Sequence, residues 1–429
     1  MQRTAKLASL PLGVAGRAAA GWGRKLMGGD RDEVSAQLSA RSAEQLFAVL
    51  GELKGGAMKF GQALSIFEAA VPDELAEPYR EALTKLQSAA PPMPAREVHR
   101  VLAEQLGRNW SDRFGSFNDE PAAAASIGQV HRAVWHDGRD VAVKVQYPGA
   151  DEALISDLRQ LGRLSRLMQP FLPGIEIKPL IAELRERMVE ELDYRDEANN
   201  QRAFAAAFAG DEQVRVPKVV ASAPKVVISE WVTGTPISAI IRDGDQATRD
   251  QVGRLLTEFL YSSPPRVGLL HADPHPGNFQ LLADGRLLVI DYGAVARLPG
   301  GWPLTLQQIA GLALRGESDA LIERLRVEGF IRPGTNLETQ EVYDYLAPFV
   351  EPLRTERFQF TRRWLQGEAE RVSDLRGADF RTARALNLPA QYLLVHRVSG
   401  GTVGVLCQLG ATVAFREIVG RWQPAVFES

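Results

Sequence analysis

The sequence predicts an α+β protein with two lobes, and three observations support this prediction. A chain of 429 residues that is 45% hydrophobic is long enough for two packed lobes and an extension. Between about Phe114 and Val145, short runs rich in β-branched residues are typical of strands. After Gly293, apolar residues recur almost throughout at helical spacing. We therefore expect a strand-containing N-terminal lobe and a mostly helical C-terminal lobe.

Four segments are expected along the chain. Residues 31–88 are predicted to be helical because Leu46, Leu50 and Leu53 follow helical spacing. Pro91–Pro94 is an expected linker into the core, and Gly234–Pro236 is an expected hinge. The predicted segments are a basic N-terminal arm over 1–34, a helical extension over 35–110, an N-terminal lobe with a helical insertion over 111–236, and a helical C-terminal lobe over 237–429.

Charge and cysteine content argue against several kinds of partner. A net charge of −3 and a pI near 6.2 argue against binding to nucleic acid. The single cysteine, Cys407, excludes an internal disulfide and suits a reducing compartment. A cytoplasmic location without disulfide-linked partners is therefore expected.

The sequence predicts no transmembrane helix, because no run of 18 uninterrupted apolar residues is present. The apolar stretch from Gly400 to Phe415 is expected to be a buried helix. The first 31 residues hold six Lys or Arg and one acid, and Pro11 and Arg17 argue against a cleaved signal peptide. A basic arm of this kind can lie on an anionic surface, so peripheral contact with the inner face of the membrane is one expectation. A packed or disordered terminus is the alternative.

The stretch His-Ala-Asp-Pro-His-Pro-Gly-Asn, residues 271–278, gives the clearest functional signal. Asp273 and Asn278 lie five residues apart, and Asp291-Tyr-Gly293 follows an apolar run over Leu287–Ile290. Phosphoryl transfer requires one carboxylate near the attacking oxygen, and a carboxylate and an amide oxygen to hold Mg²⁺ against the phosphates. The spacing predicts a kinase-like catalytic loop, with Asp273 in the first role and Asn278 and Asp291 as metal ligands.

A predicted strand upstream, Val141-Ala-Val-Lys144-Val-Gln146, contains one lysine. A kinase N-terminal lobe needs a strand lysine aimed at the α- and β-phosphates of ATP. The chain has nine lysines against forty-one arginines, so a lysine here suggests a role that needs a compact point charge rather than a planar fork. A solvent-facing lysine on an edge strand is the alternative.

Alanines occupy the place of a kinase glycine-rich loop. Residues 121–126 read Pro-Ala-Ala-Ala-Ala-Ser. Cβ atoms restrict φ, so such a loop closes less tightly over phosphates than glycines do; by itself, an alanine run favours helix. Because the run precedes the lysine strand, nucleotide binding is expected from Ala123, Ala124, Ala125, Ser126 and Gly128.

An acidic stretch, Glu190–Asn200, lies between the lysine strand and the catalytic loop. Its ordinary interpretation is a solvated helix face. Asp193 and Glu197 are four residues apart, so they share one helical face. One acid of this stretch could pair with Lys144, as the αC glutamate does in kinases.

Together these motifs resemble the UbiB/AarF-like atypical kinase family, also called the ADCK family. The resemblance covers roughly residues 45–300. It rests on Lys59-Phe-Gly-Gln62, Ala123-Ala-Ala-Ser126 and Glu191-Leu-Asp193, which match the family's Lys-x-Gly-Gln, alanine-rich and Glu-x-Asp motifs. The resemblance implies a two-lobed protein-kinase-like fold that uses ATP and Mg²⁺, with the Lys-x-Gly-Gln helix packed over the place where a protein substrate would dock.

The resemblance also implies roles for the remaining site residues. Lys59 would lie near Glu191 and Asp193. Glu197 would pair with Lys144, although Glu191 falls in the same acidic helix and the choice stays open. Family members are tied to isoprenoid-quinone and lipid homeostasis, often at membranes, so a lipid or prenylquinone-like ligand is expected. Some members carry C-terminal membrane spans, which this sequence does not predict.

A hypothesis about Lys59 follows. A lysine that faces the site is costly to bury without a partner, so a pair with Glu191 or Asp193 would act as a latch. Together with the alanine run, this latch is expected to suppress transfer to bulky protein acceptors.

The histidines add little. His271 and His275 are four residues apart, but Pro274 and Pro276 argue against a helix, so we expect no zinc site. His271 is expected to hold the catalytic loop. His131 carries no functional signal.

Three functions stay open at this point. The first is an ATP-dependent phosphotransferase or ATPase that acts on water, a lipid-like molecule or a protein hydroxyl. The second is a small-molecule phosphotransferase similar to aminoglycoside and choline kinases, against which the alanine run and the Lys-x-Gly-Gln motif argue. The third is a non-catalytic, nucleotide-gated scaffold for a lipid or a partner protein, whose site would have the same sequence.

Overall fold

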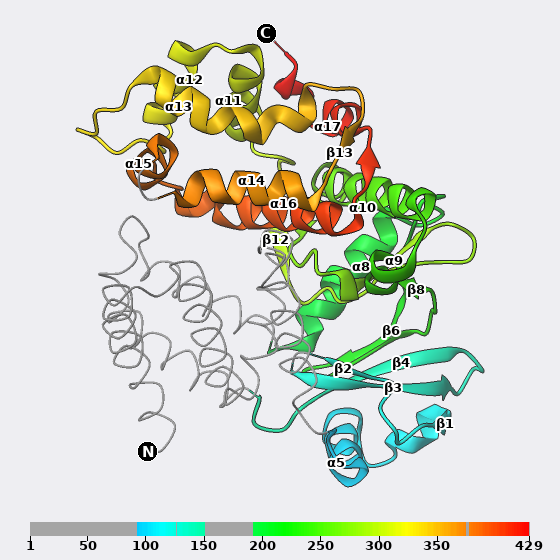
Figure 1. Cartoon of the computed structure of the whole chain (residues 1–429). Helices are drawn as coiled ribbons and strands as arrows, with labels where there is room; N and C mark the ends of the chain where they lie inside the picture. Colours follow the sequence, from blue (N-terminus) through cyan, green and yellow to red (C-terminus); the bar gives the residue numbers. More distant parts are fainter. Residues whose placement is uncertain (1–91, 126, 151–191, 375–376, 429) are drawn as a thin grey trace, which may run out of the picture. The chain divides into compact units, whose positions relative to one another are not determined.

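The computed structural model describes residues 92–125, 127–150, 192–374 and 377–428 (Figure 1). The chain divides into two compact units, Met1–Leu192 and Asp193–Ser429. Strands and helices occur in both, so the predicted α+β class is confirmed. The predicted segment boundaries stay a prediction, because the arm and most of the helical extension lie outside the described residues.

In its described residues, the first unit begins with an amphipathic helix that is followed by antiparallel strands. Helix α5 buries Val98, Val101 and Leu102 and packs on the last strand. Strand β3 pairs antiparallel with β1, β2 and β4. The β-branched runs predicted between residues 114 and 145 are confirmed. The elements are α5 (Ala95–Leu106), the 3₁₀ helix η2 (Trp110–Arg113), β1 (Phe114–Phe117), β2 (Ala123–Ala125), β3 (Gly128–Trp135) and β4 (Asp140–Gln146).

Alternation along β4 decides which side chains face the core. Val141, Val143 and Val145 are fully buried. Ala142 and Lys144 lie between them and are only partly buried. Successive side chains of a strand point to opposite faces, so Lys144 faces away from the valine core.

The second unit begins with α8 (Tyr194–Ala207) and the hairpin of β6 (Val219–Ala223) and β7 (Val226–Glu230). A small sheet follows in the order β5–β11–β10–β8, and β9 pairs separately with β12. The apolar run over Leu287–Ile290 contains strand β11. The bounds are β5 (Val214–Arg215), β8 (Thr235–Pro236), β9 (Leu269–His271), β10 (Phe279–Leu281), β11 (Leu287–Val289) and β12 (Val295–Arg297).

The expected hinge at Gly234–Pro236 is a point of close backbone approach. Thr235 and Pro236 form β8, which pairs with β10. A Cβ on Gly234 would lie 2.7 Å from the Leu281 carbonyl oxygen, so only glycine fits without a shift. Glycine is therefore required there for contact between strands.

Helices make up most of the chain after Gly293, as predicted. Helix α10 (Gln246–Val267), which precedes this region, buries Leu255, Leu256 and Phe259 and packs on β9, α16 and α17. The others are α9 (Ile237–Asp243), α11 (Leu304–Arg315), α12 (Ser318–Val327), α13 (Thr339–Leu346), the 3₁₀ helix η5 (Ala347–Leu353), α14 (Arg362–Ser373), α15 (Ala378–Ala385), α16 (Ala390–Leu409), α17 (Phe415–Trp422) and the 3₁₀ helix η6 (Pro424–Val426). Two short strands, β13 (Phe358–Gln359) and β14 (Thr412–Val413), pair with each other.

Helix α16 carries the one cysteine of the chain. Cys407 is buried, and burial raises the pKa of its thiol to about 12. The helix predicted over Gly400–Phe415 ends earlier, at Leu409, because Gly410 adopts the left-handed conformation (φ 63°) and caps it. Among the described helices, none is both long and apolar enough to cross a membrane.

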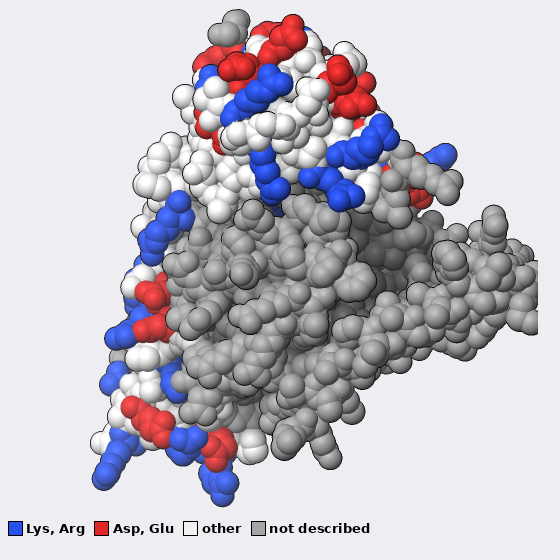
Figure 2. Space-filling model, turned by 90° about the vertical axis from the view of Figure 1, so that its left-hand side faces the viewer, with Lys and Arg blue, Asp and Glu red and all other residues white. Residues whose placement is uncertain are grey.

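Figure 2 shows basic and acidic side chains together on the described part of one face. Many of the surface charges are paired; on α5, Arg100 bonds to Glu97 and Glu104 at 2.9 and 2.7 Å. Exposed pairs of this kind contribute little to stability, because solvent and salt screen them.

Candidate active site

The predicted catalytic loop connects strand β9 to strand β10 and is held by pairing at both ends. His271 is the last residue of β9, which pairs with β12, and Phe279 opens β10, which pairs with β11. Between them, residues 276–278 form the single 3₁₀ turn η4. His271 therefore lies on a strand and His275 caps the turn, so neither lies in an α-helix, as Pro274 and Pro276 predicted. Asp273 is half-buried, and its carboxylate makes no hydrogen bond with a described residue.

Asn278 is oriented by the backbone around it. Its Nδ2 donates to the Asp273 carbonyl at 3.1 Å, and its backbone N–H donates to the His275 carbonyl at 2.9 Å. Its own carbonyl accepts from the Ile290 N–H at 2.9 Å. Because Nδ2 is engaged, the amide presents Oδ1, and amide oxygens are ligands that hard cations take.

Asp291 has a left-handed backbone conformation, with φ 63°. Within the described ranges it is the one non-glycine residue with a positive φ. The conformation costs about 1–2 kcal/mol for an L-residue, although Asp and Asn visit it more readily than others. Two bonds hold it: the carbonyl accepts from His271 Nε2 at 2.7 Å, and Oδ1 accepts from the Gly293 N–H at 3.1 Å. Backbone strain of this kind gathers at functional sites.

A buried aromatic cluster supports His271. Its ring lies 5.4 Å from Phe279, 5.5 Å from Tyr292 and 5.9 Å from Phe259, measured between centroids. Burial lowers the pKa of His271, and the charges of Asp273 and Asp291 and the bond to the Asp291 carbonyl only partly oppose it. The ring is therefore neutral, with its proton on Nε2 facing that carbonyl. This geometry fits the loop-holding role that we expected for His271.

His275 fastens the loop from within. Its Nδ1 accepts from the Gly277 N–H at 3.1 Å. A Cβ on Gly277 would lie 3.0 Å from that nitrogen, so a side chain there would press on the ring. The spacing of the motif predicts no role for His275. A hydrogen bond between residues two positions apart does not require a recognisable sequence pattern.

In the first unit, strand pairing places Lys144 and Ala123 on one face. Val130 of β3 pairs with Ala123 of β2 on one side and with Lys144 of β4 on the other. Residues directly opposite each other in antiparallel strands share a face, so these three form one row across the hairpin. The alanines, expected as a loop, form strand β2, because the edge of β3 offers their backbone groups partners.

The acidic stretch is fixed near its start. The Leu192 carbonyl, in the middle of the Glu-x-Asp motif, accepts from Gln146 Nε2 at 2.9 Å. Gln146 lies two residues after Lys144 on β4 and was not among the predicted site residues. A polar residue two positions after Lys144, and therefore on the same strand face, was the available signal.

Helix α8 carries the remaining acids. Asp193 caps it, accepting from the Arg195 N–H at 3.0 Å, and the Arg195 guanidinium holds the pKa of the Asp193 carboxyl below its usual range. Glu197 is buried, with 6% of its surface exposed. On the same helix, Asn200 Nδ2 donates to the Tyr292 carbonyl at 3.1 Å, which ties α8 to the Asp-Tyr-Gly turn.

Three predicted site residues, Lys59, Ser126 and Glu191, lie outside the described residues. The latch between Lys59 and the Glu-x-Asp acids, and the pairing of Lys144 with Glu197, stay predictions.

A family model described as the ABC1 atypical kinase-like domain matches residues 85–323, which is more than half of the chain. The chain belongs to this family. The match includes Lys144 and the catalytic loop. It also includes strands β2 and β3, which together form the alanine hairpin. The predicted UbiB/AarF-like membership and the two-lobed kinase-like fold are thereby confirmed.

Three similar proteins illustrate the likeness. The structure of Rv3197 from Mycobacterium tuberculosis, a complex with erythromycin, is 50% identical, covers 93% of this chain and 100% of that chain, and gives a TM-score of 0.71. The mitochondrial atypical kinase coq-8 of Caenorhabditis elegans is 32% identical over 72% of this chain and 41% of its own length. The chloroplastic ACTIVITY OF BC1 COMPLEX KINASE 1 of Arabidopsis thaliana is 35% identical over 62% of this chain and 39% of its own length. The chain thus spans less than half of these two curated relatives.

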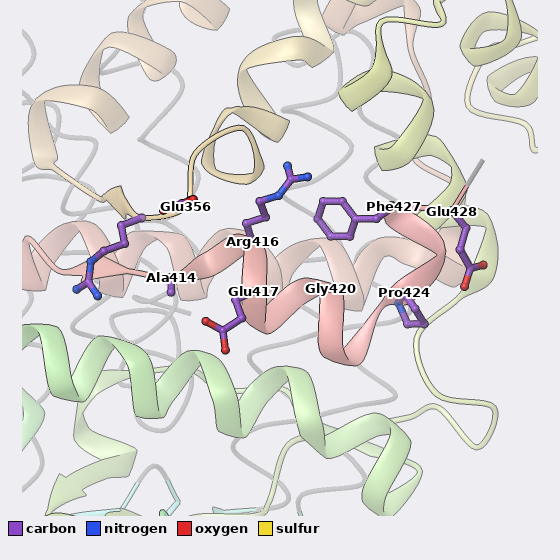
Figure 3. Close-up of a pocket in the computed structure, with 9 residues that line it drawn as sticks. Glu356, Ala414, Arg416, Glu417, Gly420, Pro424, Phe427 and Glu428 are labelled. Atoms are coloured by element: carbon purple, nitrogen blue, oxygen red, sulfur yellow. The ribbon is translucent and has the colours of Figure 1, made fainter.

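A separate hollow of the ABC1 chain lies among the C-terminal helices (Figure 3). Its volume is about 740 Å³, and it is lined by Glu356, Arg357, Ala414, Arg416, Glu417, Gly420, Pro424, Phe427 and Glu428. Arg416 lies over the Phe427 ring, 4.7 Å from its centroid, and donates to the Leu353 carbonyl at 2.7 Å. Glu417 pairs with Arg421 at 2.8 Å. None of the predicted site residues that the structure describes is among these lining residues.

Proposed function

We propose that this chain is a Mg²⁺-dependent, ATP-binding atypical kinase or ATPase. The observation that supports the proposal best is how Asp273, Asn278 and Asp291 are held. The Asn278 amide bonds to the Asp273 carbonyl, and His271 bonds to the carbonyl of a strained Asp291. Fixed acid and amide groups of these types are what phosphoryl transfer requires, because its catalysis is mainly positioning and electrostatic stabilisation.

The oxygen donors fit a magnesium ion. Asn278 offers its Oδ1 and Asp291 offers a carboxylate, and Mg²⁺ takes hard oxygen ligands of this kind. When bound, the ion would neutralise charge on the phosphates. Lys144 would pair with the α- and β-phosphates, and the backbone of the hairpin at Ala123–Gly128 would line the nucleotide.

Asp273 is proposed to act on the attacking group. Its carboxylate would orient a hydroxyl or a water and accept its proton as the new oxygen–phosphorus bond forms and the bond between the γ-phosphorus and the bridging oxygen breaks. Since no described residue occupies that carboxylate, it is available to do so. The proposed acceptors are water or a lipid-like or prenylquinone-like molecule, as membership of the family suggests. A nucleotide-gated scaffold without turnover is the alternative.

A second candidate is binding of a macrolide. One observation favours it: the Rv3197 structure, 50% identical over 93% of this chain, is a complex with erythromycin. Macrolides carry several hydroxyl groups, so such a ligand could also serve as a phosphoryl acceptor. That outcome would correspond to the small-molecule phosphotransferase considered above.

Binding and hydrolysis of Mg·ATP test these proposals. We expect the purified chain to bind Mg·ATP, and anionic liposomes with a prenylphenol to raise hydrolysis. Lys144→Ala should weaken binding because a charge-assisted bond is lost, whereas Lys218→Ala, an exposed lysine of the second unit, should not. Absence of Mg·ATP binding by the wild type would refute the proposal. Binding without hydrolysis under all conditions would favour the scaffold, and binding of erythromycin in a separate titration would favour the second candidate.

A further inference from the structure

Two buried polar side chains lie behind the alanine hairpin. Gln129 is 1% exposed and His131 is fully buried; both belong to β3. Because Val130 shares a face with Lys144, its two neighbours on β3 point to the opposite face. The proposed reaction uses neither. A polar group this deeply buried is unfavourable unless it is hydrogen-bonded, so the partners of these two residues indicate what they do.

The Gln129 amide binds both backbone groups of Met93. Its Oε1 accepts from the Met93 N–H at 2.7 Å, and its Nε2 donates to the Met93 carbonyl at 3.3 Å. Residues 91, 92 and 94 are prolines, which lack an N–H, so Met93 has the only backbone donor of this linker. The linker that enters from the N-terminal extension is therefore fastened to β3 through one side chain.

His131 continues the chain of bonds. Its Nδ1 lies 2.8 Å from the Asn118 carbonyl, which can only accept, so Nδ1 carries the proton. Its Nε2 therefore accepts from Gln129 Nε2, at 2.9 Å. The ring stacks on Phe117, 5.1 Å between centroids and 25° between planes. Burial lowers the pKa of His131, which keeps the ring in the neutral form that this arrangement needs.

The same hydrogen-bond network extends to the residues just before β2, at the base of the alanine hairpin. Asn118 lies five residues before Ala123, and its N–H donates to the Arg132 carbonyl at 3.0 Å. The Ala122 N–H donates to the Val130 carbonyl at 2.8 Å. Gln129 itself pairs with Ala124 in the register of β2 and β3. One satisfied polar network thus joins Met93, β3 and the segment that leads into the alanines, and such networks make a buried arrangement rigid.

We propose that Gln129 and His131 are positioning residues that tie Met93 of the linker to the base of the alanine hairpin, so that nucleotide affinity depends on how the linker is seated. The proposal rests on the proposed nucleotide binding by that hairpin. Linkage makes the effect reciprocal: a nucleotide that binds better when Met93 is docked must also hold Met93 in place.

Hydrogen exchange on the unaltered chain tests the reciprocal effect. The Met93 amide is the only exchangeable backbone site among residues 91–94, so its exchange can be resolved in a short peptide. We expect Mg²⁺ with a non-hydrolysable ATP analogue to slow this exchange at least about fivefold, the lower range of measured couplings. Unchanged exchange in a chain that demonstrably binds the analogue would overturn the proposal.

Substitution tests the direct effect. Gln129→Met keeps the length and volume of the side chain but removes its hydrogen bonds, and we expect it to weaken binding of the analogue at least about fivefold. The matched control is Arg108→Met, an exposed arginine of the same unit that follows α5. A folded Gln129→Met chain with wild-type affinity would overturn the proposal; if that variant does not fold, exchange at Met93 in the wild type decides. A wild type that binds no nucleotide would refute the proposed function and this inference together, whereas wild-type binding without either effect would refute the inference alone.

Discussion

The catalytic loop and the alanine hairpin are fixed in opposite ways. In the loop, side chains of defined chemistry are the working groups, and backbone atoms orient them, as the Asp273 carbonyl orients Asn278. In the hairpin, backbone atoms and one lysine are the proposed working groups, and buried side chains hold them from behind, as Gln129 does. The first arrangement leaves a motif in the sequence, because residue type and spacing are both constrained. The second arrangement is marked in the sequence only by two polar residues, Gln129 and His131, on an otherwise apolar face of β3.

The largest effect is expected from Asp291→Asn in the loop. Asn tolerates a positive φ as Asp does, so the turn should keep its shape while the carboxylate is lost. A ligand at a hundred times its Kd raises the free energy of unfolding by about 2.7 kcal/mol. We expect Asp291→Asn to lose this stabilisation by Mg·ATP completely. Thermal-shift titration measures it, with the unliganded Tm as the control for folding. A wild-type shift in this variant would show that the metal assignment is wrong.

Asp273→Asn should separate turnover from binding. General-base catalysis contributes about 10²–10⁴-fold, so we expect the rate of ATP hydrolysis or transfer to fall within that range. Affinity for Mg·ATP should stay near wild type, because the side chain makes no hydrogen bond with a described residue. Asp284→Asn, in the exposed turn between β10 and β11, is the matched control. Equal turnover in the two variants would contradict the role of Asp273.

Both regions contain a buried neutral histidine, which predicts a shared acid sensitivity. Burial lowers the pKa of His131 and of His271 below the ordinary 6.5. As the pH falls below 6.5, the unfolded chain takes up protons that the folded chain does not, so the free energy of unfolding falls. The slope is about 1.4 kcal/mol per pH unit for each histidine until its folded pKa is reached. Urea unfolding at pH 7.5, 6.5 and 5.5 measures it, and constant stability over this window would contradict the assignment.

The smallest effect is expected from Ala125→Gly in the hairpin. Glycine in a strand costs about 0.5–1 kcal/mol of stability, and it frees φ beside the nucleotide. We expect a change in affinity for Mg·ATP of about fivefold or less, since 1 kcal/mol corresponds to that factor. Ala221→Gly, in β6 of the second unit, controls for the loss of strand stability. The same affinity in both variants would mean that the alanines do not restrain the nucleotide.

Much of this arrangement follows from the sequence. Alternating valines around Lys144 predict a strand with the lysine on the face away from the core, and β4 has that pattern. The spacing of Asp273, Asn278 and Asp291 predicts a catalytic loop followed by a short strand and the Asp-Tyr-Gly turn, and β11 lies between that loop and that turn. These predictions succeed because each depends on residues within about twenty positions of one another.

The polar network behind the hairpin could not be predicted in the same way. His131 carried no signal, because its role depends on Asn118 and on Gln129, whose own partner Met93 lies 36 residues earlier in the chain. The alanine run looked helical or irregular because propensity takes no account of the edge of β3 beside it. Asp193 lies ahead of α8, as its cap, and its partner is Arg195 two residues later. In each case the observed structure depends on a tertiary or capping partner that the local sequence pattern does not identify.

The burial of Cys407 has a practical consequence for experiments on this chain. Thiol reagents attack the thiolate of an accessible cysteine, and this thiol is buried in α16 with a pKa of about 12. No other cysteine competes for the reagent. The rate of chemical labelling of Cys407 therefore measures how often local unfolding exposes this part of α16. No cysteine has to be introduced for the measurement. Labelling with and without Mg·ATP would show whether nucleotide suppresses that opening.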